Sequence, residues 1–169
     1  GIPVIACLQG AVVGGGLELA SAAHIRVADS STFFALPEGT RGIFTGGGAT
    51  VRTAKIISPN RMIELMLTGR VLDAVEGERL GLAHYVCNNE ANPKTAYELS
   101  LELAQRIAGN AILSNYAIVS SISRIADMSA TDGLFAEGLM AAVVQTGRDV
   151  QERLGEFVNK KAHKVKPTK

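Results

Sequence analysis

The chain has 169 residues, 47% of them hydrophobic, with 17 basic and 16 acidic side chains. That length and hydrophobic content suffice for one domain with a sizeable core, and they argue against intrinsic disorder. The near-balance of charge argues against a dedicated nucleic-acid-binding protein, and no apolar stretch reaches the length of a membrane span.

An apolar run opens the sequence. Residues 2–8 predict a fully buried strand that ends before Gly10. Because a buried strand needs neighbours on both sides, we interpret the chain as the C-terminal part of a longer domain. A helix predicted near 17–23 follows the glycine triplet Gly14-Gly15-Gly16. Two further strands are predicted at 25–28 and 32–36.

A second glycine triplet, Gly46-Gly47-Gly48, begins the next group of elements. Ser58-Pro59 supplies an N-cap and a first-turn proline for a helix. The capping-box spacing from Asp73 to Glu76 predicts a short helix that Gly81 ends. The other elements predicted here are helices over 49–57 and 59–67 and a brief strand over 84–87.

From Asn92-Pro93 onward only helices are predicted, near 93–108, 111–126, 131–146 and 148–162. Strands alternating with helices, followed by helices alone, indicate an α/β core (residues 1–90) with a helical C-terminal region (91–169). The helices near 111–126 and 131–146 are apolar beyond one stripe, which indicates burial on more than one side. Burial within this fold and a subunit interface explain that pattern about equally well.

Charge is unevenly distributed along the chain. All 16 acidic residues lie within residues 1–156, whereas 157–169 holds five of the 17 basic residues and no acid. We favour a solvated basic tail for 157–169.

The two cysteines, Cys7 and Cys87, lack metal-ligand spacing and make a poor disulfide framework, so we expect no metal and a reducing, cytoplasmic location.

Chemistry is indicated where the first glycine triplet meets its helix. Glycines between a strand and a helix allow a tight turn and let a ligand approach backbone N–H groups, where the helix dipole favours negative charge. A tight connection that needs glycine for packing alone also explains the triplet.

Two acidic residues strengthen the catalytic interpretation. Glu18 lies in the first helical turn between Leu17 and Leu19, and Glu38 follows an apolar strand through Pro37. Burial and mutual repulsion would favour the neutral forms of the two side chains, as general acid/base chemistry requires. Taken singly, a helix-start glutamate and a surface-loop glutamate are the simpler interpretations.

Several segments carry a further signal when they are taken together. They are GAVVGGGLELA at 10–20, IRVA at 25–28, FALPE at 34–38 with Gly42-Ile43, GGG at 46–48, LTG at 67–69, and the stretch from Ala74 to Gly81-Leu82. In combination they resemble the crotonase, or enoyl-CoA hydratase, superfamily over essentially the whole chain. The resemblance implies a ββα spiral, here partial, with C-terminal helices that assemble trimers, often as dimers of trimers. The resemblance therefore favours a subunit interface as the explanation for the apolar helices near 111–126 and 131–146.

The resemblance assigns roles to single residues. Gly15 falls at the oxyanion-hole glycine, whose N–H polarises the thioester carbonyl, and Glu18 and Glu38 fall at the two glutamates of hydratases. It implies that Glu18 activates water for attack on Cβ of an acyl-CoA and that Glu38 delivers a proton to Cα. Gly46 matches a glycine that lines the acyl pocket, with packing as a nearly equal alternative. No cofactor is implied, because coenzyme A belongs to the substrate.

Two residues near the C-terminus, Phe157 and Lys160, align with family positions that contact the CoA of a neighbouring subunit. The resemblance also places a second oxyanion-hole donor in a segment N-terminal to residue 1. The expected partners are therefore an acyl-CoA thioester and copies of the same chain, with no nucleic acid and no membrane.

Two alternatives to a hydratase remain open. An enoyl-CoA isomerase moves the double bond and can work with one carboxylate. A non-catalytic binding member is a different class of protein, and RNA binding is one role known among such members. The excess of acidic over basic residues within 1–156 argues against RNA binding, because phosphate binding needs a concentrated basic face.

Overall fold

The structure is a computed structural model of the 169-residue chain and describes residues 1–161. The chain divides into two compact units, one formed by 4–108 and the other by 1–3 together with the segment from 109 onward. Within the described residues, no helix combines the length and apolar character needed to cross a bilayer.

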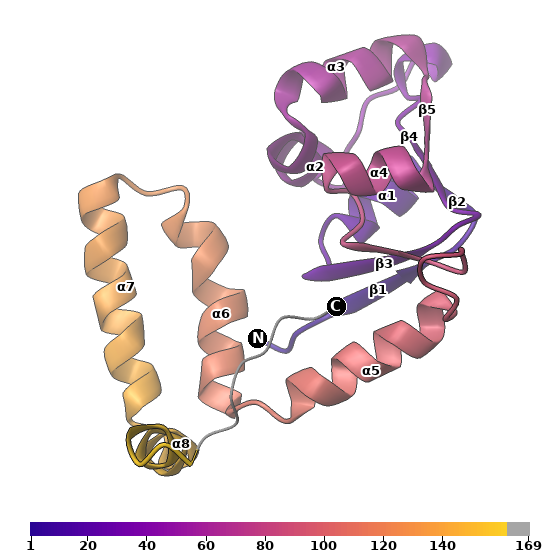
Figure 1. The fold of residues 1–169 in the computed structure, drawn as a ribbon. Helices are drawn as coiled ribbons and strands as arrows, with labels where there is room; N and C mark the ends of the chain where they lie inside the picture. Colours follow the sequence, from indigo (N-terminus) through magenta and orange to yellow (C-terminus); the bar gives the residue numbers. More distant parts are fainter. Residues whose placement is uncertain (162–169) are drawn as a thin grey trace. The chain divides into compact units, whose positions relative to one another are not determined.

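Two three-stranded sheets form the first unit, and Figure 1 shows them with the helices that surround them. One sheet has the order β1-β3-β6 with all strands parallel, and the other has the order β2-β4-β5, in which only the β4–β5 pair is antiparallel. The strands are β1 (Ile5–Leu8), β2 (Ala11–Val13), β3 (Ile25–Asp29), β4 (Phe33–Ala35), β5 (Val71–Asp73) and β6 (Tyr85–Cys87).

Local signals in the sequence mark the boundaries of two helices of this unit. Ser58 Oγ accepts a hydrogen bond from the Arg61 N–H (3.4 Å), Asp73 Oδ1 accepts one from the Glu76 N–H (2.8 Å), and Gly81 ends its helix at a φ of 88°. The helices are α1 (Gly15–Ala20), α2 (Ala49–Ile57), α3 (Pro59–Thr68), α4 (Ala74–Leu80) and α5 (Ala96–Ala108), with a 3-10 turn η1 (Gly39–Arg41). The predicted helix start at Ser58-Pro59 and the predicted helix between Asp73 and Gly81 are therefore confirmed.

The sequence does not predict β2 and β5, each of which is three residues long. Both pair with β4, with Val13 opposite Ala35 in the parallel pair and Leu72 opposite Phe34 in the antiparallel pair. Because strands this short are stabilised by the partner rather than by their own pattern, the local sequence carries little sign of them.

The core of the first unit lies between the second sheet and α1 to α4. Its largest fully buried side chains are Phe34, Leu17, Leu36, Leu65, Leu72 and Leu82. Gly77 lets α4 approach this core closely, because a Cβ at that position would lie 2.6 Å from Cδ2 of Phe34.

Helix α5 packs along β1 and β3 (Figure 1) and buries Ala96 and Leu103 against Val27 and Cys87. The compact units divide after Ala108, so this helix lies with the sheets. The sequence-based division at residue 90 assigns α5 to the helical C-terminal region and not to the region that contains the sheets.

Arg26 on β3 joins three segments of the first unit although its side chain is buried. Its guanidinium donates to the carbonyl oxygens of Leu82 (2.8 Å), Ala23 (2.9 Å) and Gly81 (3.2 Å). Burial lowers the pKa of the Arg26 guanidinium. The three carbonyl oxygens stabilise the buried cation and hold the ends of α1 and α4 to β3.

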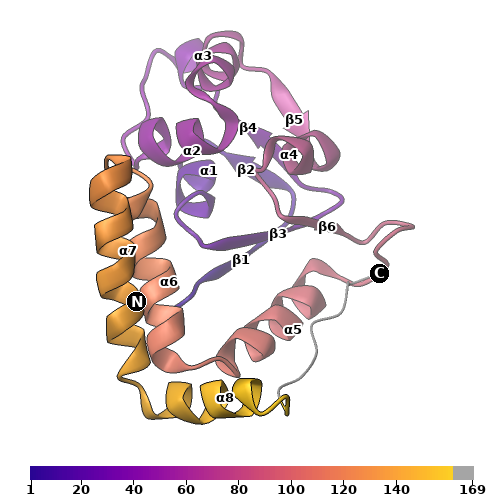
Figure 2. The ribbon, with the colours of Figure 1, turned by 60° about the vertical axis from the view of Figure 1, so that its left-hand side comes forward.

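The second unit is helical and contains α6 (Ile112–Ile125), α7 (Ala130–Gln145) and α8 (Arg148–Val158). Helices α6 and α7 lie side by side as a hairpin, and α8 follows them (Figure 2). Several large apolar side chains of the hairpin are 53–79% exposed, namely Ile112, Ile118, Ile122, Leu134, Phe135 and Leu139. Packing within this unit therefore does not account for their apolar character. The predicted helix end at 162 and Lys164, Lys166 and Lys169 of the tail lie outside the described residues.

Candidate active site

The parallel pairing of β2 with β4 brings the two acidic residues to one edge of a sheet. Val13 lies opposite Ala35, and both strands end there, so the chain leaves them at the same edge. Glu18 follows in α1, and Glu38 follows immediately before η1. Both side chains are buried, with exposed fractions of 8% for Glu18 and 6% for Glu38.

The carboxylate of Glu18 is bound by the second glycine triplet. Its Oε1 accepts hydrogen bonds from the N–H groups of Gly47 (2.7 Å) and Ala49 (3.2 Å). Ala49 is the first residue of α2, where an N–H has no acceptor within the helix and the dipole favours a negative charge. A Cβ at Gly47 would lie 2.9 Å from Glu18 Oε2, so this contact requires glycine.

The carboxylate of Glu38 reaches the first glycine triplet. A Cβ at Gly14 would lie 3.1 Å from Glu38 Oε1, and Gly14 has a φ of 56° that also favours glycine. Among the described residues, Glu38 Oε2 is buried and has no hydrogen-bond partner. Such an atom is open to a hydrogen bond from a bound ligand.

Open space surrounds two other glycines that the sequence singles out. Apart from the glycine itself, its chain neighbours and the backbone of its own helix, no heavy atom of the described residues lies within 4 Å of the position that a Cβ would take at Gly15 or at Gly46, and both residues are exposed. Gly15 is the first residue of α1, so its N–H has no acceptor in a preceding helical turn. A ligand has access to the backbone at both positions.

The structure thus brings Gly15, Glu18, Glu38 and the second glycine triplet together in the first unit. Phe157 and Lys160 belong to the second unit. Phe157 lies in α8 and is 71% exposed, and Lys160 is exposed just beyond the end of α8. Glu18 and Glu38 belong to the first unit.

Two contributors to the site are not predicted from the sequence, Gly47 and Arg52. Gly47 lies in the second glycine triplet, of which the sequence predicts only Gly46 as a site residue. Arg52 on α2 donates from Nη2 to the carbonyl oxygen of Gly47. The one available signal was an arginine close to the start of a predicted helix, where a positive charge opposes the dipole.

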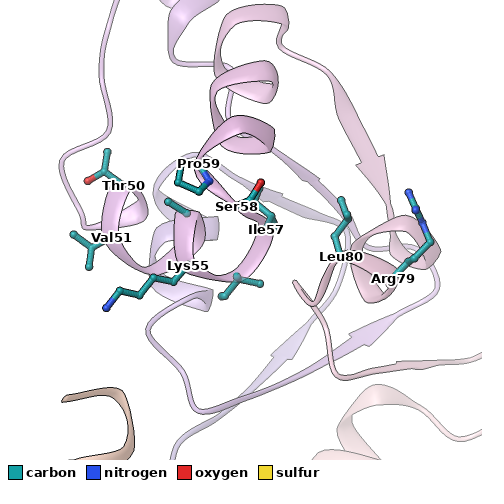
Figure 3. Close-up of a pocket in the computed structure, with 10 residues that line it drawn as sticks. Thr50, Val51, Lys55, Ile57, Ser58, Pro59, Arg79 and Leu80 are labelled. Atoms are coloured by element: carbon teal, nitrogen blue, oxygen red, sulfur yellow. The ribbon is translucent and has the colours of Figure 1, made fainter. Parts of the chain in front are cut away.

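A separate cavity of about 830 Å³ lies where α2 meets α3 and α4 (Figure 3). It is lined by Thr50, Val51, Ala54, Lys55, Ile56, Ile57, Ser58, Pro59, Arg79 and Leu80. Figure 3 shows the charged ends of Lys55 and Arg79 extending in different directions, so they do not form a paired cationic site. Within residues 1–161, no three His, Cys, Asp or Glu side chains are grouped to hold a metal ion.

Comparison with known proteins relates the chain to one protein family. The family model described as enoyl-CoA hydratase/isomerase matches residues 1–166. The chain is 34% identical to human enoyl-CoA hydratase domain-containing protein 2, mitochondrial, over 96% of the chain and 56% of that protein. It is 32% identical to mouse methylglutaconyl-CoA hydratase, mitochondrial, over 98% of the chain and 52% of that protein. The chain therefore spans about half the length of these curated relatives.

Solved structures show the same likeness. A Rhodopseudomonas palustris protein assigned as an enoyl-CoA hydratase is 48% identical and matches with a TM-score of 0.87 over 94% of the chain and 60% of its own. An enoyl-CoA hydratase from Bacillus anthracis is 32% identical, with a TM-score of 0.85 over 94% of the chain and 60% of its own. These matches confirm the predicted α/β fold of the crotonase type.

Proposed function

Because the chain belongs to the enoyl-CoA hydratase/isomerase family, we propose that the protein carrying it adds water across the α,β double bond of an acyl-CoA thioester. One observation carries the proposal: two buried carboxylates each reach a glycine triplet at one edge of the same sheet. The names of the relatives, which include a methylglutaconyl-CoA hydratase, support this reaction.

Glu18 activates the attacking water. Its Oε1 is held by two backbone N–H groups, so the orientation of the carboxylate is set before substrate binds. Oε2 remains to accept a proton from water as the oxygen of that water attacks Cβ. No side-chain rearrangement is needed at that moment, because both donors are backbone N–H groups.

Glu38 and Gly15 act on the other half of the substrate. As the C–O bond forms at Cβ, negative charge moves to the thioester oxygen, where the Gly15 N–H stabilises it. Glu38 then delivers a proton to Cα, and Oε2, which has no hydrogen-bond partner among the described residues, is the oxygen that supports contact with the substrate. Water has then supplied hydroxyl to Cβ, and return of the proton from Glu18 to Glu38 through solvent restores both acids.

The remaining assignments concern substrate binding and assembly. The open space at Gly46 supports a role in lining the acyl pocket. The exposed side chains of Phe157 and Lys160 support contact with the CoA of a neighbouring subunit, and the exposed apolar faces of α6 and α7 support a trimer or a dimer of trimers. Coenzyme A enters as part of the substrate, and no cofactor is proposed. The cytoplasmic location stays a prediction, because several relatives are named as mitochondrial proteins.

Hydration of crotonyl-CoA by the whole protein tests the proposal, followed by the loss of the ultraviolet absorbance of the conjugated thioester. We expect Glu18→Gln and Glu38→Gln each to lower kcat by about 10²–10⁴-fold, the usual contribution of a general acid or base. Glu90→Gln, which changes an exposed glutamate of the same unit, is the matched control and should leave the rate unchanged. Full activity in both site variants would overturn the two-carboxylate mechanism.

The same protein distinguishes the hydratase from an isomerase. A 3-enoyl-CoA substrate reports movement of the double bond, which needs one carboxylate to carry a proton between two carbons. Isomerisation that survives in Glu18→Gln, together with no hydration by the unmodified protein, would assign the isomerase instead.

A further inference from the structure

Arg52 is a half-buried cation that faces backbone rather than a carboxylate. Within residues 1–161, its side chain makes no ion pair. Its Nη2 donates to the Gly47 carbonyl oxygen, and its Nε is buried with no hydrogen-bond partner among the residues that the structure describes. Arg52 also lies near the start of α2, where the helix dipole disfavours a positive charge. Neither charge pairing nor helix stability explains an arginine at this position.

The contacts of Gly47 connect this arginine to Glu18. The Gly47 carbonyl oxygen accepts from Arg52, and the Gly47 N–H donates to Glu18 Oε1. Arg52 therefore holds the peptide on one side of the Gly47 Cα, and Glu18 holds the peptide on the other side. Fixing the first peptide limits rotation of the second.

The two adjacent glycines make room for the two charged groups. A Cβ at Gly47 would lie 2.9 Å from the Glu18 carboxylate, and a Cβ at Gly48 would lie 2.7 Å from Cζ of Arg52. Gly48 has a φ of 100°, which side-chain-bearing residues rarely adopt. The second triplet therefore lies between Glu18 and Arg52. Gly47 leaves space for the carboxylate, and Gly48 leaves space for the guanidinium.

We propose that Arg52 is a positioning residue that orients Glu18 through Gly47. The guanidinium fixes the peptide that follows Gly47 and so limits rotation of the preceding peptide, whose Gly47 N–H, together with the Ala49 N–H, holds Glu18 Oε1 and leaves Oε2 for water. This role rests on the proposed function, in which Glu18 is the base for hydration. Arg52 contacts neither substrate nor Glu18 directly in this arrangement.

Two reactions of one protein separate this role from a general structural one. Hydration of crotonyl-CoA requires Glu18, whereas exchange of the Cα protons of butyryl-CoA with deuterated water requires Glu38 and Gly15 but no attacking water. We expect Arg52→Met to lower kcat for hydration by about 10–100-fold with KM nearly unchanged, and to leave exchange within about twofold. Arg52→Gln, which restores a donor for the Gly47 carbonyl without a charge, should recover most of the hydration rate. Arg61→Met is the matched control, since Arg61 is a half-buried arginine of α3 that pairs with Glu64 (3.4 Å), and it should change neither reaction.

Amide spectra give a second readout that does not depend on turnover. In Arg52→Met the Gly47 and Ala49 amide resonances should shift, and their protection from hydrogen exchange should fall, as in Glu18→Gln. Unchanged amides in Arg52→Met would overturn the proposal, as would equal losses of hydration and exchange. A protein that fails to hydrate crotonyl-CoA contradicts the proposed function, and the amide measurement still decides the role of Arg52.

Discussion

Glu38 Oε1 lies against the backbone of Gly14, so that a Cβ at Gly14 would stand only 3.1 Å away. Glu38 follows β4 and Gly14 follows β2, and the parallel register of the two strands produces the contact. The first glycine triplet therefore has a second use besides turning the chain, because its first member leaves space for a buried carboxylate.

We predict that Gly14→Ala lowers hydration by at least tenfold and the free energy of unfolding by about 1–3 kcal/mol, the range for a strained backbone position. Gly10→Ala is the matched control, since Gly10 has a similar φ of 61° but no atom within 4 Å of the position of a Cβ. Urea unfolding should show losses of similar size in both variants, whereas the rate assay should respond to Gly14→Ala alone. Equal effects of both variants on the rate would contradict the contact with Glu38.

Gly39→Ala should disturb the same acid from its other side. A Cβ at Gly39 would collide with the Met66 carbonyl oxygen on α3, and backbone there cannot move aside as a flexible side chain can. We expect a loss of about 1–3 kcal/mol in the free energy of unfolding, together with loss of hydration, because η1 and the adjacent Glu38 must shift. Gly138→Ala, within α7 and with open space around it, should instead gain up to about 1 kcal/mol by helix propensity. Urea denaturation of the two variants makes the comparison, and a neutral Gly39→Ala would refute the close approach of η1 to α3.

Stability should depend on pH through His84. Partial burial of the ring, and then the nearby Arg26 guanidinium, lower the pKa of His84 below its ordinary value of 6.5, and His84 Nδ1 accepts a hydrogen bond from the Arg26 N–H (3.1 Å). The unfolded chain therefore binds a proton at a higher pH than the folded chain does. The contribution of neutral His84 is complete above about pH 6.5 and is lost as the pH falls through the folded pKa.

His84→Asn keeps an acceptor oxygen for Arg26 but does not titrate, which makes it the matched variant. The urea midpoint of the unmodified chain should fall more steeply than that of His84→Asn between about pH 7 and pH 5. Parallel pH profiles would show that His84 does not carry this dependence.

The two thiols should differ in reactivity. Cys87 is fully buried, and burial raises the pKa of its thiol, whereas Cys7 is exposed. A thiol reagent should therefore modify Cys7 in the folded chain and Cys87 only after unfolding, because the thiolate is the reactive form. Peptide mass mapping identifies the modified residue, and Cys7→Ser should abolish labelling of the folded chain. Rapid labelling of folded Cys87 would contradict its burial.

The starts of α3 and α4, each capped by a side chain, were the most predictable part of the fold, whereas the helix predicted near 17–23 spans Gly15–Ala20. The side chains of Ser58 and Asp73 cap the first turns that they precede, so a few adjacent residues contain the whole signal. Strands β2 and β5 depend on β4, which lies elsewhere in the sequence, and no local pattern reports that pairing.

The candidate site divides in the same way. Glu18 and Glu38 stand out in the sequence because apolar residues flank them, and the structure buries both. The hydrogen bond from Gly47 to Glu18 joins residues far apart in the sequence, and Arg52 contributes through a backbone carbonyl. Neither relationship leaves a spacing or a residue type that a single sequence can reveal.

The hydrogen bonds of Glu18 bear on how relatives of this chain can be sorted into active and inactive proteins. A descendant that abandons the reaction still needs an acceptor for the N–H groups at the start of α2, so natural selection would retain Glu18, or a glutamine in its place, for the sake of the helix. Glu38 has no such second duty, since its Oε2 accepts no hydrogen bond from the described residues. Loss of Glu38 is therefore a more informative sign of an inactive relative than loss of Glu18.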